Sequence, residues 1–194
     1  MDWAWLVVIG AYALGTFPSA QLVGRLVDHD PTTEGSGNPG ASNMLRVAGK
    51  SAGAAVLVLD TLKGAVATLV GLGLDGRPLA AACGVAAVLG HILPIGRGRR
   101  GGKGVATFGG VGLVMWPFVS LGALALWIVL VRLTKKPSIG SLVGIVFIVA
   151  GVWTTGRDGW EIALAAGLVA VIVIRHAGNI RRLFGRSEKA VGPS

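Results

Sequence analysis

Six long apolar stretches separated by short polar segments make up most of this chain. They cover residues 3–27, 51–74, 78–95, 105–131, 139–155 and 160–174. Residues 3–21, 79–90 and 105–131 contain no Asp, Glu, Lys, Arg or His, and a helix that crosses a bilayer core needs about 20 apolar residues. The alternation over ten-residue segments that is typical of an outer-membrane barrel is absent. The pattern therefore predicts an all-α fold, a polytopic transmembrane helical bundle.

Composition supports this class of protein. Of the 194 residues, 53% are hydrophobic and only 14% are charged, whereas a soluble domain is about 25% charged. The mean hydropathy is +0.70. The net charge of +9 is compatible with binding to nucleic acid, but the basic residues lie between the apolar stretches. Their placement indicates membrane topology instead, and we expect no nucleic-acid partner.

Lysine and arginine are distributed unevenly among the loops. The first, third and fourth loops and the C-terminal tail contain or adjoin fifteen of the 18, while the second and fifth loops have one arginine each, offset by an aspartate. Cytoplasmic loops carry the basic excess. We therefore predict an outside N-terminus, a cytoplasmic C-terminus and one membrane domain over residues 1–194. Its cytoplasmic motif loops are expected at about 28–50, 96–104, 132–141 and 175–194.

The 27-residue stretch 105–131 conflicts with this topology if it is one helix. It separates two basic loops that should both be cytoplasmic, and a single helix would be about 40 Å long in a core of about 30 Å. Proline ends or kinks a helix and tryptophan favours the membrane interface, so a break is expected near Trp116 and Pro117. A pair of short helices there predicts seven helices in all. The alternative is six helices with one basic loop outside.

The first apolar stretch and the cysteine content give two further expectations. The first stretch is too long for a cleaved signal peptide and lacks a basic segment before it, so we expect a retained helix. The one cysteine, Cys83, lies in an apolar stretch, which excludes an intramolecular disulfide.

Two polar segments match the glycine pattern G-x-G-x-x-G: "GSGNPG" at 35–40 and "GRGRRG" at 96–101. A dinucleotide-binding fold is excluded because each segment follows an apolar span and no βαβ unit fits around it. A Walker loop is excluded because Lys103 would need glycine at 97 and serine or threonine at 104. Glycines still let successive N–H groups form an anion nest. Two nests on one membrane face predict the binding of two phosphate groups.

Plainer interpretations remain for several of these residues. Arg97, Arg99 and Arg100 are also suited to anchoring on anionic lipid headgroups. The glycines at helix ends are suited to capping. Asp60 and Lys63, one helical turn apart in a span, can neutralise each other as a structural tie or serve a site.

Taken together, "GSGNPGASNMLR", "GHILPIGRGRRGGKGVAT" and "RHAGNIRRLFGRSE" resemble the acyl-phosphate-dependent glycerol-3-phosphate acyltransferases, bacterial membrane enzymes that start phospholipid synthesis. The resemblance covers most of the chain, in the same order, and implies seven membrane helices with cytoplasmic motifs in the bacterial inner membrane. Three positions depart from the family pattern. Ser42 replaces the usual threonine, "RGRR" precedes "GGKG", and "KPSIGS", with Ser138 and Ser141, matches the serine-rich loop only loosely.

The resemblance implies transfer of a fatty acyl group from acyl phosphate to the 1-hydroxyl of glycerol 3-phosphate, without a cofactor. It assigns the catalytic and glycerol phosphate-binding roles to Ser36, Arg46, Lys103, His176 and Asn179. It assigns Gly101, Gly102 and Lys103, with Ser141, to acyl phosphate. The wider predicted substrate-binding set adds Gly35, Gly37, Asn38, Ser42, Asn43, Gly104, Thr107 and Glu188.

The chemistry of the remaining polar residues is less determined. His176 and the phosphate of the substrate are alternative general bases, since both titrate near pH 6. His176 is also compatible with a residue at the membrane interface where a helix ends, and His91 with a structural hydrogen-bonding residue. Thr107 is also compatible with a role at the start of a helix, and Glu188 with a role in a solvated tail. The three histidines are scattered and no carboxylates have ligand spacing, so no metal is expected.

Two other functions compete with this one. A transporter or channel for an organic phosphate would also use polar loops in a helical bundle, although no inverted repeat is visible in the hydropathy. An acyl-CoA-dependent acyltransferase would normally have a histidine–acid pair such as H-x-x-x-x-D, which the chain lacks. The expected partners are the two substrates and membrane lipids, with no obligate protein partner.

Overall fold

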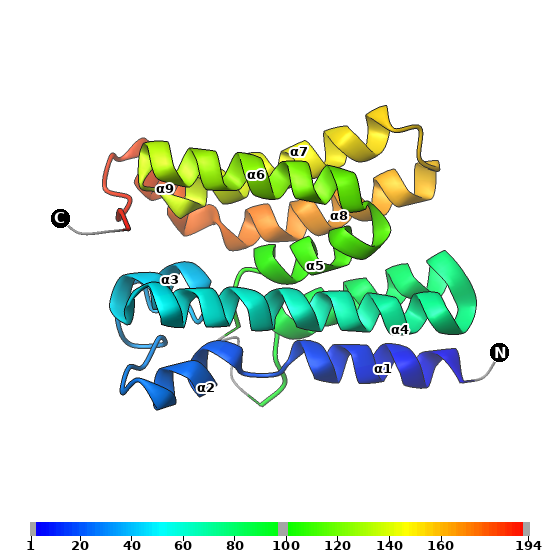
Figure 1. Cartoon of the computed structure of the whole chain (residues 1–194), viewed down its shortest axis with the longest axis horizontal. Helices are drawn as coiled ribbons and strands as arrows, with labels where there is room; N and C mark the ends of the chain where they lie inside the picture. The colour runs from blue at the N-terminus through cyan, green and yellow to red at the C-terminus, as the bar shows by residue number, and fades with distance from the viewer. Residues whose placement is uncertain (1–2, 97–100, 192–194) are drawn as a thin grey trace. The chain divides into compact units, whose positions relative to one another are not determined.

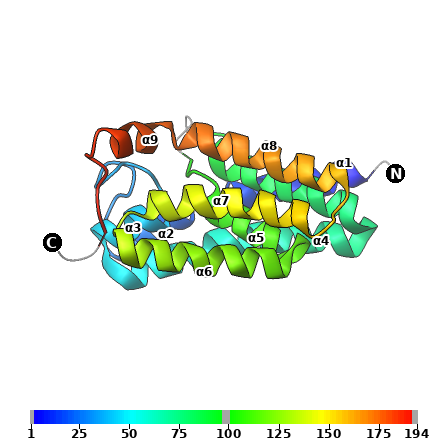
Figure 2. The same ribbon diagram turned by 90° about the horizontal axis from the view of Figure 1, so that it is seen from above.

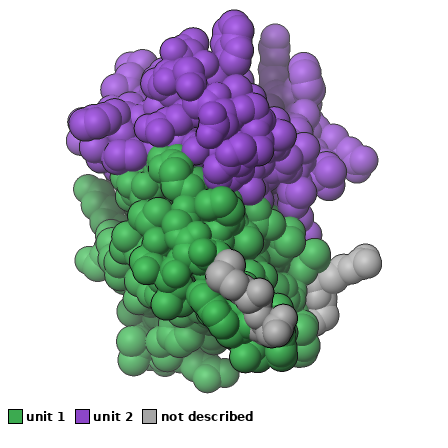
Figure 3. All heavy atoms as spheres, turned by 90° about the vertical axis from the view of Figure 1, so that its right-hand side faces the viewer, with its two compact units in different colours: residues 1–115 green, residues 116–194 purple. Residues whose placement is uncertain are grey.

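The computed structural model describes residues 3–96 and 101–191, and the regular structure in these ranges is entirely helical (Figure 1; Figure 2). In chain order the helices are α1 (Ala4–Gly15), α2 (Ser19–Leu26), α3 (Ala41–Val47), α4 (Gly49–Ile92), α5 (Val105–Met115), α6 (Pro117–Thr134), α7 (Pro137–Thr154), α8 (Gly159–Arg175) and α9 (Ala177–Phe184). The predicted all-α fold is confirmed. Two compact units make up the chain, unit 1 (Met1–Met115) and unit 2 (Trp116–Ser194), coloured separately in Figure 3.

Several of these helices suit a membrane by length and composition. In the described ranges, Ala4–Leu26, Gly49–Ile92, Pro117–Thr134 and Pro137–Thr154 are long and apolar enough to cross one. Gly159–Arg175 and Ala177–Phe184 pass the same test as a pair bent by 61°, and Val105–Met115 is a shorter apolar helix. The predicted count of seven membrane helices and the orientation of the termini stay predictions.

The first apolar stretch differs from the prediction of one retained helix. The structure ends α1 at Gly15 and begins α2 at Ser19, with Pro18 as the non-helical residue between them (φ −85°, ψ 60°). Proline has no N–H to continue the ladder and clashes with the preceding turn. The break exposes the carbonyl of Phe17 to other side chains, and it lies beside the site described below.

The long helix α4 is a hairpin of two helical arms. Asp75 (φ −152°) and Gly76 (φ 69°) interrupt it with non-helical backbone, and only glycine readily adopts the second of these conformations. Gly71 packs against the backbone of Ala80, so the two arms run back along each other (Figure 1). The arms correspond to the predicted stretches 51–74 and 78–95.

Glycine allows the helices of unit 1 to approach at backbone distance. A Cβ on Gly64 would collide with the carbonyl oxygen of Thr107, and a Cβ on Gly110 with that of Thr61, where α4 crosses α5. A Cβ on Gly15 would likewise collide with the carbonyl of Ala87 on α4. Small residues at crossings are typical of membrane helices, whose association depends on close van der Waals packing.

The predicted break in stretch 105–131 is present. Helix α5 ends at Met115 and α6 begins at Pro117, with Trp116 in a non-helical conformation (φ −142°, ψ 66°). The side chain of Trp116 is 1% exposed, and its indole N–H donates to the carboxylate of Glu161 at 2.5 Å. A buried indole N–H needs an acceptor, and Glu161, 2% exposed, supplies it within unit 2.

A tight turn joins α6 to α7 in unit 2. Lys135 closes α6 in the left-handed conformation (φ 58°), and Pro137 is the first residue of α7, a position where proline costs no hydrogen bond. The carbonyl of Lys135 also accepts the N–H of Val191 at 2.8 Å. This bond ties the C-terminal tail to the turn.

Candidate active site

The first glycine motif forms the loop between α2 and α3. Gly35 (φ 63°) and Gly37 (φ 68°) lie in the left-handed region, and Ser36 between them is exposed. Asn38 and Ser42 are half-buried at the end of the loop and in the first turn of α3. The loop therefore presents an exposed serine at the surface of unit 1. The N–H groups of Ser36, Gly37 and Gly40 donate within the loop, to Asn43 Oδ1 at 2.8 Å, the Glu34 carbonyl at 2.9 Å and the Asn38 carbonyl at 2.9 Å, so these three N–H groups do not form the predicted anion nest.

The side chain of Asn43 holds this loop from inside. It is 1% exposed, and its Oδ1 accepts the N–H of Ser36 at 2.8 Å and Nη1 of Arg46 at 3.3 Å. Its Nδ2 donates to the carbonyl oxygens of Pro31 at 3.1 Å and Glu34 at 3.0 Å. The two donors and two acceptor positions of the amide are thus used by the loop. The geometry favours support of Ser36 and Arg46 by Asn43 over the predicted direct contact with substrate.

A second set of hydrogen bonds, which the sequence did not predict, stabilises the first part of the loop. The carboxylate of Glu34 accepts from His29 Nδ1 at 2.8 Å and from the N–H of Asp30 at 2.7 Å. The hydrogen bond from His29, followed by that from Asp30, holds the pKa of Glu34 below its usual value. The side chain of Asp30 in turn accepts the N–H of Thr32 at 2.8 Å, an Asx-type turn that the spacing in "HDPTTE" indicates.

The described part of the second glycine motif lies flat against the end of α4. Arg97, Arg99 and Arg100 lie outside the described residues. The N–H of Gly102 donates to the carbonyl of His91 at 3.1 Å. A Cβ on Gly101 would collide with the carbonyls of His91 and Ile92, and a Cβ on Gly102 with the imidazole of His91. Lys103 follows, half-buried, two residues before α5 begins.

Gly104 and Thr107 connect this motif to α5. Gly104 has a positive φ of 91°, and its carbonyl accepts the N–H of Phe108 at 2.8 Å, so the backbone turns directly into the helix. Helix α5 begins at Val105, as expected. Thr107 is fully buried, and its hydroxyl has no hydrogen-bond partner among the described residues. It lies inside the crossing with α4 and does not cap the helix.

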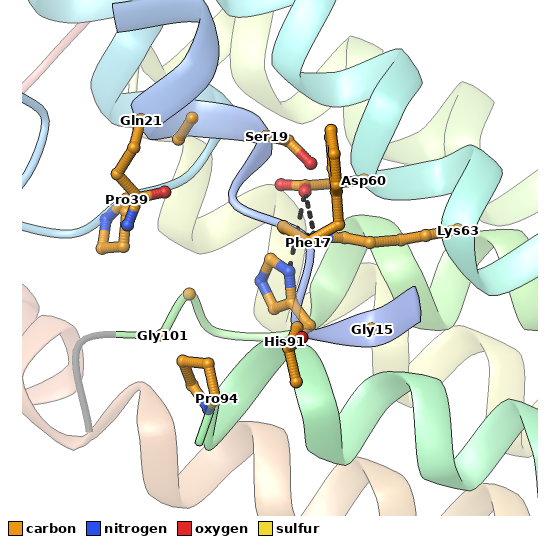
Figure 4. Close-up of a pocket in the computed structure, with 13 residues that line it drawn as sticks. Gly15, Phe17, Ser19, Gln21, Pro39, Asp60, Lys63, His91, Pro94 and Gly101 are labelled. Atoms are coloured by element: carbon orange, nitrogen blue, oxygen red, sulfur yellow. Dashed lines mark hydrogen bonds and ion pairs between the residues drawn. The ribbon is translucent and has the colours of Figure 1, made fainter. Parts of the chain in front are cut away.

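The two glycine motifs of unit 1 border the same pocket (Figure 4). Pro39 of the first motif and Gly101 and Gly102 of the second line it, with the α1–α2 break on another side. The cavity volume is only about 10 Å³, far below the roughly 300–1,000 Å³ of sites for drug-sized ligands and close to the space that one water molecule needs. The lining is polar, and a group larger than a water molecule fits only if the lining moves.

A buried charged cluster lines the inner side of this pocket. Lys63 Nζ lies 2.8 Å from the Asp60 carboxylate and donates to the Phe17 carbonyl at 3.0 Å. His91 Nδ1 lies 3.6 Å from the same carboxylate. The predicted neutralisation of Asp60 by Lys63 is therefore present, and Figure 4 shows both links to Asp60. The hydroxyl of Ser19, 2% exposed, has no partner in the described part of the chain.

In unit 2, His176 lies at the bend between α8 and α9. It is 2% exposed, and its Nδ1 lies 2.8 Å from the carbonyl oxygen of Ile172. Because a carbonyl only accepts, Nδ1 carries the proton, and the neutral ring keeps its lone pair on Nε2. A histidine oriented in this way has an acceptor nitrogen suited to a general base.

Asn179 is held by the C-terminal tail. Its Nδ2 donates to Glu188 Oε1 at 2.5 Å, and Arg182 Nε donates to Glu188 Oε2 at 2.7 Å. Burial alone would raise the pKa of Glu188, but the hydrogen bonds from Asn179 and Arg182 outweigh it and lower the pKa. The Ser138 hydroxyl contributes to this lowering, although its geometry falls short of a hydrogen bond. Glu188 is thus a buried anchor for Asn179, not a solvated tail residue.

The loosely matching serines lie in the first turns of α7. Both Ser138 and Ser141 are buried. Ser141 accepts the indole N–H of Trp127 at 3.3 Å through its Oγ, which leaves its own O–H as a donor. No group of three metal-ligating side chains is present in the described ranges.

Comparison with known proteins indicates one family. The family profile described as "Glycerol-3-phosphate acyltransferase" matches residues 5–186. A protein of that name from Thioalkalivibrio sulfidiphilus is 41% identical over 96% of this chain and 93% of its own. Another, from Shewanella halifaxensis, is 42% identical over 96% and 94%. The chain belongs to the glycerol-3-phosphate acyltransferase family.

Solved structures of the family agree with this result. PlsY (YgiH), an integral membrane glycerol 3-phosphate acyltransferase, matches in its glycerol 3-phosphate form with a TM-score of 0.92 and 33% identity, over 97% of this chain and 96% of that one. Its lysophosphatidic acid form matches with a TM-score of 0.89 and 32% identity, over 97% and 95%. The predicted family, enzyme class and multi-pass membrane fold are confirmed.

Within this acyltransferase we expect the Glu188 anchor to be sensitive to acid. A carboxyl whose pKa is lowered on folding contributes stability that is present above its ordinary value of 4.5 and lost as the pH falls through the lowered value. The protection of residues 177–191 against hydrogen exchange, measured relative to the intrinsic exchange rate at each pH, should therefore fall below pH 4.5. Glu188→Gln should exchange fast at every pH, whereas Asp158→Asn, at an exposed carboxylate of unit 2, should follow the unmodified protein. Equal exchange in Glu188→Gln and the unmodified protein would contradict the anchor.

Proposed function

We propose that this membrane acyltransferase moves a fatty acyl group from acyl phosphate to the 1-hydroxyl of glycerol 3-phosphate, giving lysophosphatidic acid and inorganic phosphate. The observation that carries the proposal is the match over nearly the whole chain to a structure solved in a glycerol 3-phosphate form. A lysophosphatidic acid form of the same protein supports the product. Both glycine loops of unit 1 border one pocket, which supports the assignment of the two motifs to one site.

The main task of the site is to bring two dianions together. Two dianions about 5 Å apart repel each other by about 3 kcal/mol in water, and by more in a medium of lower dielectric constant. Cationic side chains and oriented N–H groups must offset that repulsion. We assign this role to Arg46 and Lys103, with the backbone around Gly101 and Gly102. Arginine offers a fork to phosphate and lysine a compact charge.

The remaining roles follow from the geometry of each unit. Ser36, exposed between two left-handed glycines, is proposed to contact the glycerol phosphate. Within unit 2, Asn179, fixed by Glu188, and His176 are proposed to be substrate-binding residues. Ser141, with a free O–H donor direction beside Trp127, is proposed to contact acyl phosphate.

The chemistry is a direct transfer. The 1-hydroxyl oxygen attacks the acyl carbonyl carbon, the bond from that carbon to the phosphate oxygen breaks, and phosphate leaves with the electron pair. The hydroxyl proton passes either to Nε2 of His176 or to a substrate phosphate, whose second pKa is near 6. Ser19 lines the same pocket as His91 and Asp60, but its hydroxyl has no hydrogen-bond partner among the described residues. No serine is therefore hydrogen-bonded to His91 there, and we expect no acyl-enzyme.

The membrane arrangement is part of the proposal. We infer seven membrane helices, an outside N-terminus and a cytoplasmic C-terminus in a bacterial inner membrane, with the site on the cytoplasmic face. The break at Trp116 and the hairpin turn at Gly76 support the count. The basic excess in the motif loops supports the orientation.

An assay with two acyl donors tests the function. The purified chain in detergent, with glycerol 3-phosphate, should form lysophosphatidic acid from acyl phosphate without any added protein or metal. It should form none from acyl-CoA above an enzyme-free control. Turnover from acyl-CoA alone would overturn the proposed donor. No turnover with either donor, together with glycerol phosphate uptake into proteoliposomes, would favour the transporter.

A further inference from the structure

The charged cluster of Asp60, Lys63 and His91 has no role in the proposed chemistry. Its side chains are 2%, 5% and 8% exposed, respectively, and all three lie on α4, a candidate membrane span. Charges inside membrane segments are costly to bury, and they are retained where they serve a site or a specific contact. The position of this cluster indicates which contact it serves.

The cluster is joined to the second glycine motif through His91. The backbone carbonyl of His91 accepts the N–H of Gly102 at 3.1 Å. The imidazole lies so close to Gly102 that any Cβ there would meet Nε2. Gly101 lies against the carbonyls of His91 and Ile92. The two residues before Lys103 therefore rest on His91 through both its backbone and its ring.

The other members of the cluster fix the orientation of that ring. The Asp60 carboxylate lies 3.6 Å from His91 Nδ1, beyond a hydrogen bond but close enough for its field to favour a proton on Nδ1. Lys63 holds the carboxylate at 2.8 Å and is itself held by the Phe17 carbonyl at the α1–α2 break. Figure 4 shows Phe17, Lys63, Asp60 and His91 of this chain of contacts, and His91 in turn contacts Gly102.

We propose that Asp60, Lys63 and His91 are positioning residues that hold the segment 101–103 in its phosphate-binding conformation. The inference rests on the proposed function of that segment. A glycine-rich segment is flexible. The bond from the Gly102 N–H to the His91 carbonyl uses that donor but fixes the backbone that carries Lys103, and a cation stabilises an anion strongly only when it is fixed before the anion binds. The cluster supplies the rigid support that the glycines lack.

Substitutions at His91 test this role. His91→Leu removes the polar ring, and we expect the KM for acyl phosphate to rise roughly tenfold, as for a displaced binding group. The KM for glycerol 3-phosphate should rise less, because within the segment 101–103 only Lys103 is also assigned to that substrate. His91→Gln keeps a polar atom near the position of Nε2 and should recover much of the loss. Thr68→Val is the matched control, because Thr68 is buried on α4 and bonds only to its own helix at Gly64. It should leave both KM values unchanged.

Each outcome decides the inference. A folded His91→Leu with an unchanged KM for acyl phosphate, or with both KM values raised equally, overturns it. If His91→Leu does not fold, Asp60→Asn decides instead, because it removes the charge that orients the ring and keeps its size. Asp60→Asn should raise the KM for acyl phosphate selectively, and equal KM values would again overturn the positioning role. Failure of the proposed function would appear separately, as an unmodified protein that does not use acyl phosphate.

Discussion

Replacing Lys103 with alanine is expected to reduce kcat/KM for acyl phosphate by a factor of about 10²–10³, while the protein stays folded. Lys103 is half-buried directly after the two glycines that rest on His91, and it precedes the N-terminus of α5. The removal of one preorganised group that stabilises charge in the transition state costs about 3 kcal/mol. Steady-state kinetics in detergent measures the loss, and a thermal melt checks the fold.

Lys50→Ala is the matched control for this substitution. Lys50 is exposed in the first turn of α4, so Lys50→Ala removes the same charge from the same unit without touching the loop at 101–104. We expect its kinetics to be unchanged. Turnover in a folded Lys103→Ala equal to that of the unmodified protein would refute the phosphate-binding role of the second motif. Lys103→Arg should recover only part of the activity, because a planar fork does not replace a point charge.

The second large effect is expected at Asn43. Replacing it with leucine should lower activity at least about 100-fold, because a site displaced by roughly 1 Å loses that much. The substitution leaves the N–H of Ser36 and the carbonyls of Pro31 and Glu34 without their partner. Each buried polar group left unsatisfied costs about 1–3 kcal/mol, so the melting temperature should also fall. Kinetics and a thermal melt measure the two effects.

The variants Asn43→Asp and Thr33→Val test whether the loss of activity comes from the lost hydrogen bonds of Asn43 to the loop. Aspartate keeps the acceptor for Ser36 but replaces the donor to Pro31 and Glu34 with an oxygen, so we expect it to be nearly as damaging as leucine. Thr33 is exposed in the same loop, and Thr33→Val should behave like the unmodified protein. A fully active Asn43→Asp would show that the hydrogen bonds to the two carbonyls do not support the site.

Much of the fold was predictable because hydropathy reports directly on membrane helices. The break near Pro117 followed from the length of the stretch and from the proline itself. The break at Pro18 was missed because its neighbours are apolar, and a window of about 20 residues averages over it. Glu161, which accepts the hydrogen bond from the Trp116 indole N–H, is 45 positions away in the sequence, and no local pattern indicates such a pairing.

The site residues divide in the same way. The glycines, Ser36, Arg46 and Lys103 could be singled out because their types and spacing suit a phosphate. The supporting role of Asn43 could not, because an asparagine that contacts a ligand and one that braces a loop look alike in sequence. The roles of Glu34 and Glu188 likewise depend on partners that only the folded loops supply, His29 for the first and Asn179 and Arg182 for the second.

The close helix crossings of unit 1 limit how this enzyme can be thermostabilised. Replacing helical glycine by alanine commonly adds stability because it restricts the unfolded chain. At Gly15, Gly64 and Gly110 the added methyl would strike backbone atoms, which cannot move aside as a flexible side chain can. Gly73 on α4 and Gly167 on α8 have open space around the new Cβ. An engineering campaign should therefore begin at those two positions and leave the crossing glycines untouched.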